Sequence, residues 1–274
     1  MLKKEDYLEP DCPFDTSMWE KNEASGMIPM DRVMEREDEL LSRNDYAGAE
    51  KVLRYWIDEA ESLGDRRGIF LVENELMGLY RKLGRESDAR ASMEKALSLI
   101  PELGYEDSVS GATCYINAGT VLKAFDDPEG AMELFEKARP IYEEKVKSSD
   151  WRLGGMYNNL GLVYFDLDRY DEALEVYGKA LEVVRNIPGQ QPEAAITMLN
   201  IADVYVFKYG FADGELKIRG AIEQAWEYLD APGLERNGNY AFVCEKCAPI
   251  FEYYGYIEYA DECRRRAREV YERS

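Results

Sequence analysis

A pair of cysteines three positions apart is the pattern in this 274-residue chain that comes nearest to a chemical site. The stretch Cys244-Glu245-Lys246-Cys247, with Cys263 further along, has the spacing of half a zinc site or of a redox pair. A fourth ligand is missing, the chain holds no histidine, and the pair falls inside an expected helix. We therefore interpret these side chains as packed or solvent-facing thiols and expect neither a metal nor another cofactor.

The other patterns of catalytic or binding type are weaker. Asp166-Leu167-Asp168 resembles the start of a calcium loop, but the glycine and the closing glutamate of that loop are missing, so we interpret these residues as turn acids. The absence of histidine excludes histidine-based triads and histidine metal sites. No glycine-rich phosphate loop occurs, and nothing assembles a nucleophile, a base and an orienting group. We expect that the protein is not an enzyme.

The charge balance limits the class of partner. The chain has 34 Lys and Arg against 55 Asp and Glu, which gives a net charge of −21 and a pI near 4.5. This charge disfavours nucleic acids and anionic membranes, because both need a positive protein surface. Residues Met1–Pro10 do not form a secretory signal, and the five cysteines have no disulfide-framework spacing. We expect reduced thiols and a cytoplasmic protein.

A repeat organises the elements that must position any site. After Gly161, a large residue stands three positions on, alanine stands twelve and nineteen on, and an aromatic residue stands sixteen on: Tyr164, Ala173, Ala180 and Tyr177. The same offsets hold from Met77 and from Gly119, with a methionine in the aromatic place of the first copy. The three starts are spaced by 42 residues both times, a regularity that indicates a repeat architecture.

Weaker copies flank these three and bring the expected number of units to six. Two start at Ala202 and Ala248, and residues 46–56 match the second half of a unit whose first helix would run through Met34 and Leu40. Within each half-unit the apolar residues recur every three or four positions, which is the period of one helix face. No alternating strand pattern competes, so we expect an all-α protein.

Turn-forming residues stand where the helices of each pair should separate. They are Arg43-Asn44-Asp45, Leu83-Gly84-Arg85, Asp126-Asp127-Pro128, Asp166-Leu167-Asp168 and Tyr209-Gly210. Pro128 suits the first turn of a helix, where its missing N–H costs nothing. Pro101 and the Ile187-Pro188-Gly189 turn lie between units, and we expect them to end the preceding helices.

These residues resemble the tetratricopeptide repeat (TPR), a helix-turn-helix unit of about 34 residues that stacks into a superhelix. The stretch from Asn159 to Ala180 matches the family pattern closely, and the period of 42 residues is similar to that of kinesin-light-chain repeats. The resemblance implies a right-handed α-solenoid of about six units. It would occupy residues 30–274, with residues 1–29 as an irregular N-terminal arm.

In this family the first helix of each unit lines the concave face. The resemblance therefore implies inward positions in four successive units: Asn74, Gly78 and Arg81; Ile116, Thr120 and Lys123; Asn158, Leu162 and Phe165; Leu199, Asp203 and Val206. Six of them are our candidate partner-binding residues: Asn74, Arg81, Lys123, Asn158, Leu162 and Phe165. The amides would hold a peptide backbone, the cations a carboxylate or an acidic segment, and the last two residues an apolar side chain.

These assignments have structural alternatives. The cations could pair with neighbouring acids, because such exposed pairs are common. Asn117, Asn159 and Asn200 each precede the small residue of their unit by two positions, which suits a role between helices rather than in binding. The arginine-rich last helix, residues 264–273, could hold an anion, but it also suits a polar cap at the end of the stack.

The sequence thus predicts a protein–protein interaction module that binds a peptide or protein segment in a concave groove, without catalysis. One alternative is a peptide-sensing regulator similar to bacterial TPR receptors. The arm of 29 residues is short for the extra domain that such receptors carry. Another alternative is a self-associating scaffold, such as a homodimer.

Overall fold

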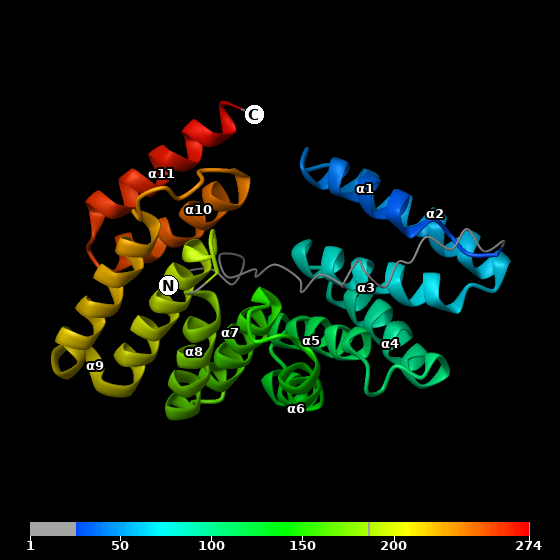
Figure 1. Ribbon diagram of the computed structural model, residues 1–274, viewed down its shortest axis with the longest axis horizontal. Coiled ribbons are helices and arrows are strands. Elements are labelled where there is room, and N and C mark those ends of the chain that lie inside the picture. Colours follow the sequence, from blue (N-terminus) through cyan, green and yellow to red (C-terminus); the bar gives the residue numbers. More distant parts are fainter. Residues whose placement is uncertain (1–25, 186, 274) are drawn as a thin grey trace. The chain divides into compact units, whose positions relative to one another are not determined.

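The structure is a computed structural model that describes residues 26–185 and 187–273. Over these residues the chain forms eleven helices and no strand (Figure 1), which confirms the all-α prediction. The helices divide into two compact units, with the boundary between residues 146 and 147. We call residues 26–146 the N-terminal unit and residues 147–273 the C-terminal unit. Most of the expected arm at 1–29 lies outside the described residues, and the handedness of the superhelix stays a prediction.

The N-terminal unit contains three helical pairs. They are α1 (Met30–Leu41) with α2 (Tyr46–Leu63), α3 (Arg66–Lys82) with α4 (Glu86–Leu103), and α5 (Val109–Ala124) with α6 (Pro128–Lys145). The first pair matches the repeat pattern least well in sequence, yet α1 lies where its apolar pattern predicts a helix. Pro128 occupies the first position of α6, as expected.

The C-terminal unit contains α7 (Trp151–Asp166), α8 (Tyr170–Val184), α9 (Gln191–Leu229), α10 (Gly238–Tyr253) and α11 (Ile257–Tyr271). Helix α9 consists of two arms joined at Gly210, whose φ of 76° and ψ of 166° are not helical. In Figure 1 the helix folds back on itself at this break. The two arms therefore form the fifth helical pair, and α10 with α11 forms the sixth, which agrees with the six expected units.

A residue with positive φ stands at the turn inside every pair. These residues are Asn44, Gly84, Asp126, Asp168, Gly210 and Gly255. Glycine, asparagine and aspartate adopt this left-handed conformation at the lowest cost, so they can end one helix and reverse the chain. Five of these turns were predicted from the sequence, and all five are confirmed.

Side-chain caps determine where several helices begin. Asp45, Asp65 and Asp127 each accept a hydrogen bond from the amide of the glycine three residues on. This bond satisfies an amide that has no partner within the helix. Asp65 is buried and also accepts a hydrogen bond from the amide of Ile28, at 2.9 Å. It thereby ties the chain that enters α1 to the turn between α2 and α3.

The small residue of the repeat faces the large residue sixteen positions on. A Cβ added at Gly119 would lie 2.8 Å from the Phe135 ring, and one added at Gly161 would overlap the Tyr177 ring. Both rings are fully buried. The absence of a side chain at the glycines thus lets the two helices of a pair approach closely around the ring, which explains the pattern seen in the sequence.

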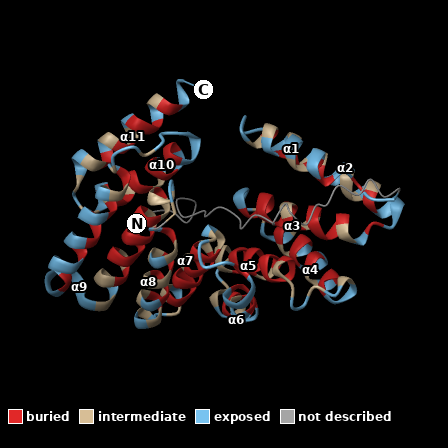
Figure 2. Ribbon diagram, viewed as in Figure 1, coloured by how far each residue is buried: buried red, intermediate tan, exposed pale blue. Residues whose placement is uncertain are grey.

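The first helices of the central pairs are buried around most of their circumference. Figure 2 shows buried residues along α3, α5 and α7, whereas α4, α6 and α8 expose one side. The reason is packing: α3, for example, packs on α2, α4 and α5. A partner can therefore reach a side chain on a first helix only where the neighbouring helices leave it exposed.

The position of Pro101 contradicts the expectation that this proline ends a helix. It does not end the preceding helix but lies inside α4, which continues to Leu103 and ends at Gly104, with φ of 67°. A proline this close to the C-terminus removes only one late hydrogen bond, so the helix can continue for half a turn until a left-handed glycine stops it. The Ile187-Pro188-Gly189 turn, in contrast, does separate α8 from α9.

Membrane-spanning helices are absent from the described part of the chain. None of the helices over residues 26–185 and 187–273 combines the length and the hydropathy that crossing a bilayer requires. The expected cytoplasmic location stays a prediction.

Candidate functional site

Three of the six candidate residues lie in the N-terminal unit, on α3 and α5. Asn74 exposes 2% of its surface, and its side-chain oxygen accepts a hydrogen bond from the amide of Asn117 at 3.4 Å. Arg81 exposes 4%, whereas Lys123 is half-buried. Lys123 is therefore the candidate of this unit that a partner can touch directly. Asn74 joins α3 to α5 through an amide pair.

The other three candidates lie on α7, in the C-terminal unit, at spacings that place them on one face of the helix. Asn158 is half-buried, and its side-chain oxygen accepts a hydrogen bond from the amide of Asn200 at 3.2 Å. The same oxygen lies 3.1 Å from the Thr197 hydroxyl. Both of these partners belong to the first arm of α9, so two contacts hold the Asn158 side chain in one orientation.

The two amide pairs follow one rule. Asn74 and Asn158 precede the starting residue of their repeat by three positions, and each accepts from an asparagine two positions before the starting residue of the next repeat. The role between helices that we offered as an alternative for Asn117 and Asn200 is thereby confirmed. Ile116 takes the equivalent position in the third repeat, where an amide pair of this kind cannot form.

Leu162 and Phe165 occupy different environments on α7. Leu162 is buried, and Phe165 is half-buried. The Phe165 ring meets Phe207 of α9 edge-on, with 5.0 Å between the ring centroids, and Tyr170 lies against both. Phe165 and Asn158 therefore combine an apolar contact and a fixed amide on the same helix face.

Asp203 was expected to face inward but was not among our six candidates. It lies on the first arm of α9, is half-buried, and accepts a hydrogen bond from the hydroxyl of Tyr254 at the end of α10. Burial raises the pKa of Asp203 from its ordinary value of 3.8 to about 6, although the Tyr254 hydrogen bond acts in the opposite direction. A carboxyl group with a raised pKa at a half-buried position is a candidate functional group.

Three exposed aromatic side chains in the same unit were not predicted from the sequence. Phe207, Phe211 and Tyr253 expose 64%, 55% and 54% of their surfaces. The centroid of the Phe211 ring lies 6.4 Å from that of Tyr253 and 6.3 Å from that of Tyr254. Phe207 stands one helical turn after Asp203, and this spacing was the available signal. Exposure itself could not be predicted, because it depends on how the neighbouring pairs pack.

The cysteines and the turn acids have structural roles. Cys114, Cys244, Cys247 and Cys263 are buried free thiols, and Cys12 lies outside the described residues. Within residues 26–185 and 187–273, no cluster of cysteines and acids is arranged to hold a metal ion. Asp168 has the positive φ of a turn residue, as its interpretation as a turn acid requires.

Arg266 gives the basic last helix a role inside the fold. Its buried guanidinium donates to the carbonyl of Leu229, the hydroxyl of Tyr240 and the carboxylates of Asp230 and Glu262, at 2.6–3.2 Å. One side chain therefore joins α9, α10 and α11. Its neighbours on the helix surface form ion pairs with acids near them.

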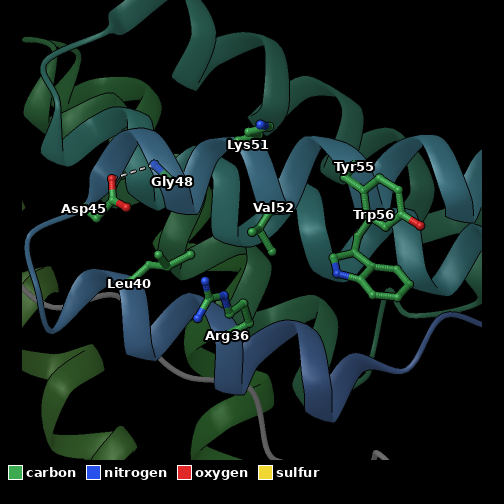
Figure 3. Close-up of a pocket in the computed structure, with 8 residues that line it drawn as sticks. All are labelled: Arg36, Leu40, Asp45, Gly48, Lys51, Val52, Tyr55 and Trp56. Atoms are coloured by element: carbon green, nitrogen blue, oxygen red, sulfur yellow. Dashed lines mark hydrogen bonds between the residues drawn. The ribbon is translucent and has the colours of Figure 1, made fainter.

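The N-terminal unit also has an open hollow between α1 and α2 (Figure 3). Its volume is about 470 Å³, and it is lined by Arg36, Leu40, Asp45, Gly48, Lys51, Val52, Tyr55 and Trp56. Asp45 is occupied in capping α2. None of the six candidate residues lines this hollow, so it is separate from the surface expected from the sequence.

Known proteins match this chain through its repeats. The tetratricopeptide repeat model matches residues 69–144 and 152–208. Two curated relatives from Arabidopsis thaliana are KINESIN LIGHT CHAIN-RELATED 1, 25% identical over 148 residues, and KINESIN LIGHT CHAIN-RELATED 3, 27% identical over 124 residues. These alignments cover 52% and 45% of this chain, which spans only 23% and 19% of the relatives' own lengths.

Solved structures share the fold at low sequence identity. BtubC (BKLC) from P. vanneervenii has a TM-score of 0.64 at 24% identity, covering 73% of this chain and 79% of that one. RapI in its apo form has a TM-score of 0.59 at 15% identity, covering 90% of this chain and all of the other. NprR, solved with its cognate peptide NprX, has a TM-score of 0.58 at 16% identity, covering 86% and 65%.

Proposed function

Because this chain is a tetratricopeptide-repeat protein of the kinesin-light-chain type, we propose that it binds a peptide or protein segment on the first helices of its repeats. Binding, rather than catalysis, is the activity that these surfaces suit. The activity of the longer relatives is not assigned to this chain, because the chain spans only about a fifth of their length. The proposed binding surface is therefore defined by this chain's own residues.

The observation that carries the proposal is the Asn158 face of α7. Two contacts from α9 orient the amide, and Phe165 with Phe207 forms an aromatic contact on the same side. A backbone amide of a bound segment can pair with a side-chain amide of this kind, while an apolar side chain packs on the rings. Because the groups are already held in place, little conformational entropy is lost on binding.

The N-terminal unit would contribute a separate contact. Lys123 is the half-buried cation of α5, and a carboxylate of the partner is the group that it would bind. Arg81 and Asn74 are buried, so their role there would be to support α3 and α5 rather than to meet the partner directly. The acidic or carboxylate-bearing partner expected from the sequence thus depends mainly on Lys123.

A peptide-sensing regulator is the more specific version of this function. The fold of NprR, which was solved with its cognate peptide, extends over 86% of this chain, and that of RapI over 90%. Both likenesses concern the fold, so the chemistry of a peptide ligand must come from this chain's own surface. Self-association as a homodimer is a further alternative, which light scattering at increasing protein concentration would detect.

The test is selection of peptides from a random phage-displayed library on the full-length protein. A double variant, Asn158→Ala with Phe165→Ala, removes the amide and the ring from the α7 face. The matched control, Gln224→Ala with Leu216→Ala, removes an amide and an apolar side chain from exposed positions of α9. Circular dichroism must show that both variants melt cooperatively.

We expect the wild type and the control to retain the same peptides, and the α7 variant to lose affinity by roughly 30-fold, the effect of removing an interface hot spot. Equal retention by all three proteins would contradict the proposed surface. Failure of the wild type to select any peptide sequence would contradict peptide binding itself.

A further inference from the structure

Within the part of the chain that the structure describes, the Asp203 carboxylate has a hydrogen-bond donor but no cation paired with it. Tyr254 is the group that interacts with it, and none of the ion pairs over residues 26–185 and 187–273 includes Asp203. Two lysines of the same helix have other partners: Lys208 pairs with Asp171, and Lys217 lies over the rings of Tyr205 and Tyr209. A desolvated carboxylate is stabilised by a positive charge that enters its site.

Exposed aromatic rings lie on the same helices that hold this carboxylate and its hydrogen-bond donor. Phe207 follows Asp203 by one turn of α9, and Tyr254, which donates to Asp203, packs against Phe211 and Tyr253. Phe207, Phe211 and Tyr253 are each more than half exposed. Exposed ring faces attract cations through their negative π-surface, so the rings and the carboxylate favour the same kind of ligand.

We propose that the C-terminal unit binds a cationic side chain, lysine or arginine, of the partner segment, with Asp203 as the counter-ion and Phe207, Phe211 and Tyr253 as aromatic walls. The inference rests on the proposed peptide-binding function and adds the chemistry of one ligand position. The net charge of −21 supports it, because the field of an acidic protein draws basic partners toward the surface.

Pools of degenerate, N-acetylated and C-amidated peptides provide the probe. Each pool carries one fixed central residue, which is lysine, arginine, glutamate or leucine, and binding to the full-length protein is measured by fluorescence anisotropy. Asp203→Asn removes the charge while keeping an oxygen that can accept from Tyr254. Asp213→Asn is the matched control, because it removes an exposed acid from the second arm of the same helix.

The wild type and Asp213→Asn should bind the lysine and arginine pools at least about tenfold more tightly than the glutamate pool, the effect of a charge-assisted contact. Asp203→Asn should lose this preference while still binding the leucine pool. Phe211→Ala, at a position more than half exposed, should weaken the cationic pools by about fivefold.

Two results would overturn the inference. One is a wild type that binds the pools without preferring a cation, which leaves the proposed peptide binding intact. The other is a cation preference that survives in Asp203→Asn. If the wild type binds no pool at all, the inference and the proposed function fail together.

Discussion

At the scale of single residues, the surroundings of a carboxyl group decide what it can do. Burial raises the pKa of Asp203 to about 6, whereas the hydrogen bond from Arg265 lowers the pKa of Glu262 to about 2. The two acids lie in the same unit, but one is desolvated without a cation and the other is surrounded by arginines. The first is a position where a ligand charge is favourable, and the second belongs to the stability of the last helix.

The raised pKa of Asp203 predicts how the stability of the protein changes with pH. Its folded pKa of about 6 lies above the ordinary 3.8, so the folded protein binds the proton more tightly than the unfolded chain, and this contribution to stability is lost as the pH rises through that range. Asp203→Asn lacks this contribution to stability. The free energy of unfolding of the variant, relative to wild type, should therefore rise between about pH 4 and about pH 6 and stay level above.

Urea unfolding at a series of pH values measures this difference. Taking the difference between two proteins cancels the acids that titrate in both. Leu216→Ala, which changes no ionisable group at an exposed position of the same helix, should show no such rise. A flat profile for Asp203→Asn would mean that burial does not perturb this carboxyl group.

At the scale of helices, close approach within a pair depends on the glycine that starts the repeat where one is present. Gly161 lies in α7 against the buried Tyr177 ring, while Gly155 lies in the same helix with no atom in the way of an added Cβ. The two glycines thus have the same secondary structure and differ in what they face. This difference separates the packing role of a glycine from its effect on helix formation.

Gly161→Ala should destabilise the protein by about 2 kcal/mol, since overpacking against Tyr177 outweighs the helix propensity gained by alanine. Gly155→Ala should be neutral or stabilising by up to about 1 kcal/mol, because only the gain in propensity applies. Chemical denaturation at neutral pH measures both. A stabilising Gly161→Ala would show that the ring can move aside at no cost.

At the scale of the molecule, excess negative charge opposes folding. With a net charge of −21, the excess negative charges repel one another in any compact state. Exposed ion pairs such as Arg66–Glu102 each contribute little to the free energy of unfolding. The repulsion acts over many charges and is screened by salt more strongly than the contacts inside close pairs. The same screening would weaken the attraction of a basic partner.

Raising NaCl from about 0.02 M to about 0.3 M should therefore raise the thermal unfolding midpoint by a few degrees. Calorimetry measures the shift, and KCl at equal ionic strength should reproduce it. A lower midpoint in salt would show that the ion pairs contribute more stability than the repulsion removes.

Much of the fold could be predicted because its determinants are local or recur at a constant spacing. The helical period, the turn residues Asn44, Gly84, Asp126, Asp168 and Gly210, and the offset between Gly161 and Tyr177 all appear as patterns along one chain. Pro101 was misjudged because a proline inside a helix removes only one backbone hydrogen bond, a loss that packing can outweigh, as Pro140 in α6 and Pro249 in α10 also show. The candidate surface was less predictable, and its positions divide between the two units.

By itself, the sequence determined the helical class, the six repeats and their turns, since these depend on backbone preferences and on contacts within one pair of helices. Only the tertiary structure decided which inward residues are accessible. Asn74 and Arg81 are buried, whereas Lys123 and Asn158 are partly exposed. Tertiary structure also brought the Tyr254 hydroxyl to Asp203. The physical reason is that the exposure of a residue on a first helix is decided by side chains of the next repeat, about 42 residues away in the chain, through packing that no local pattern records.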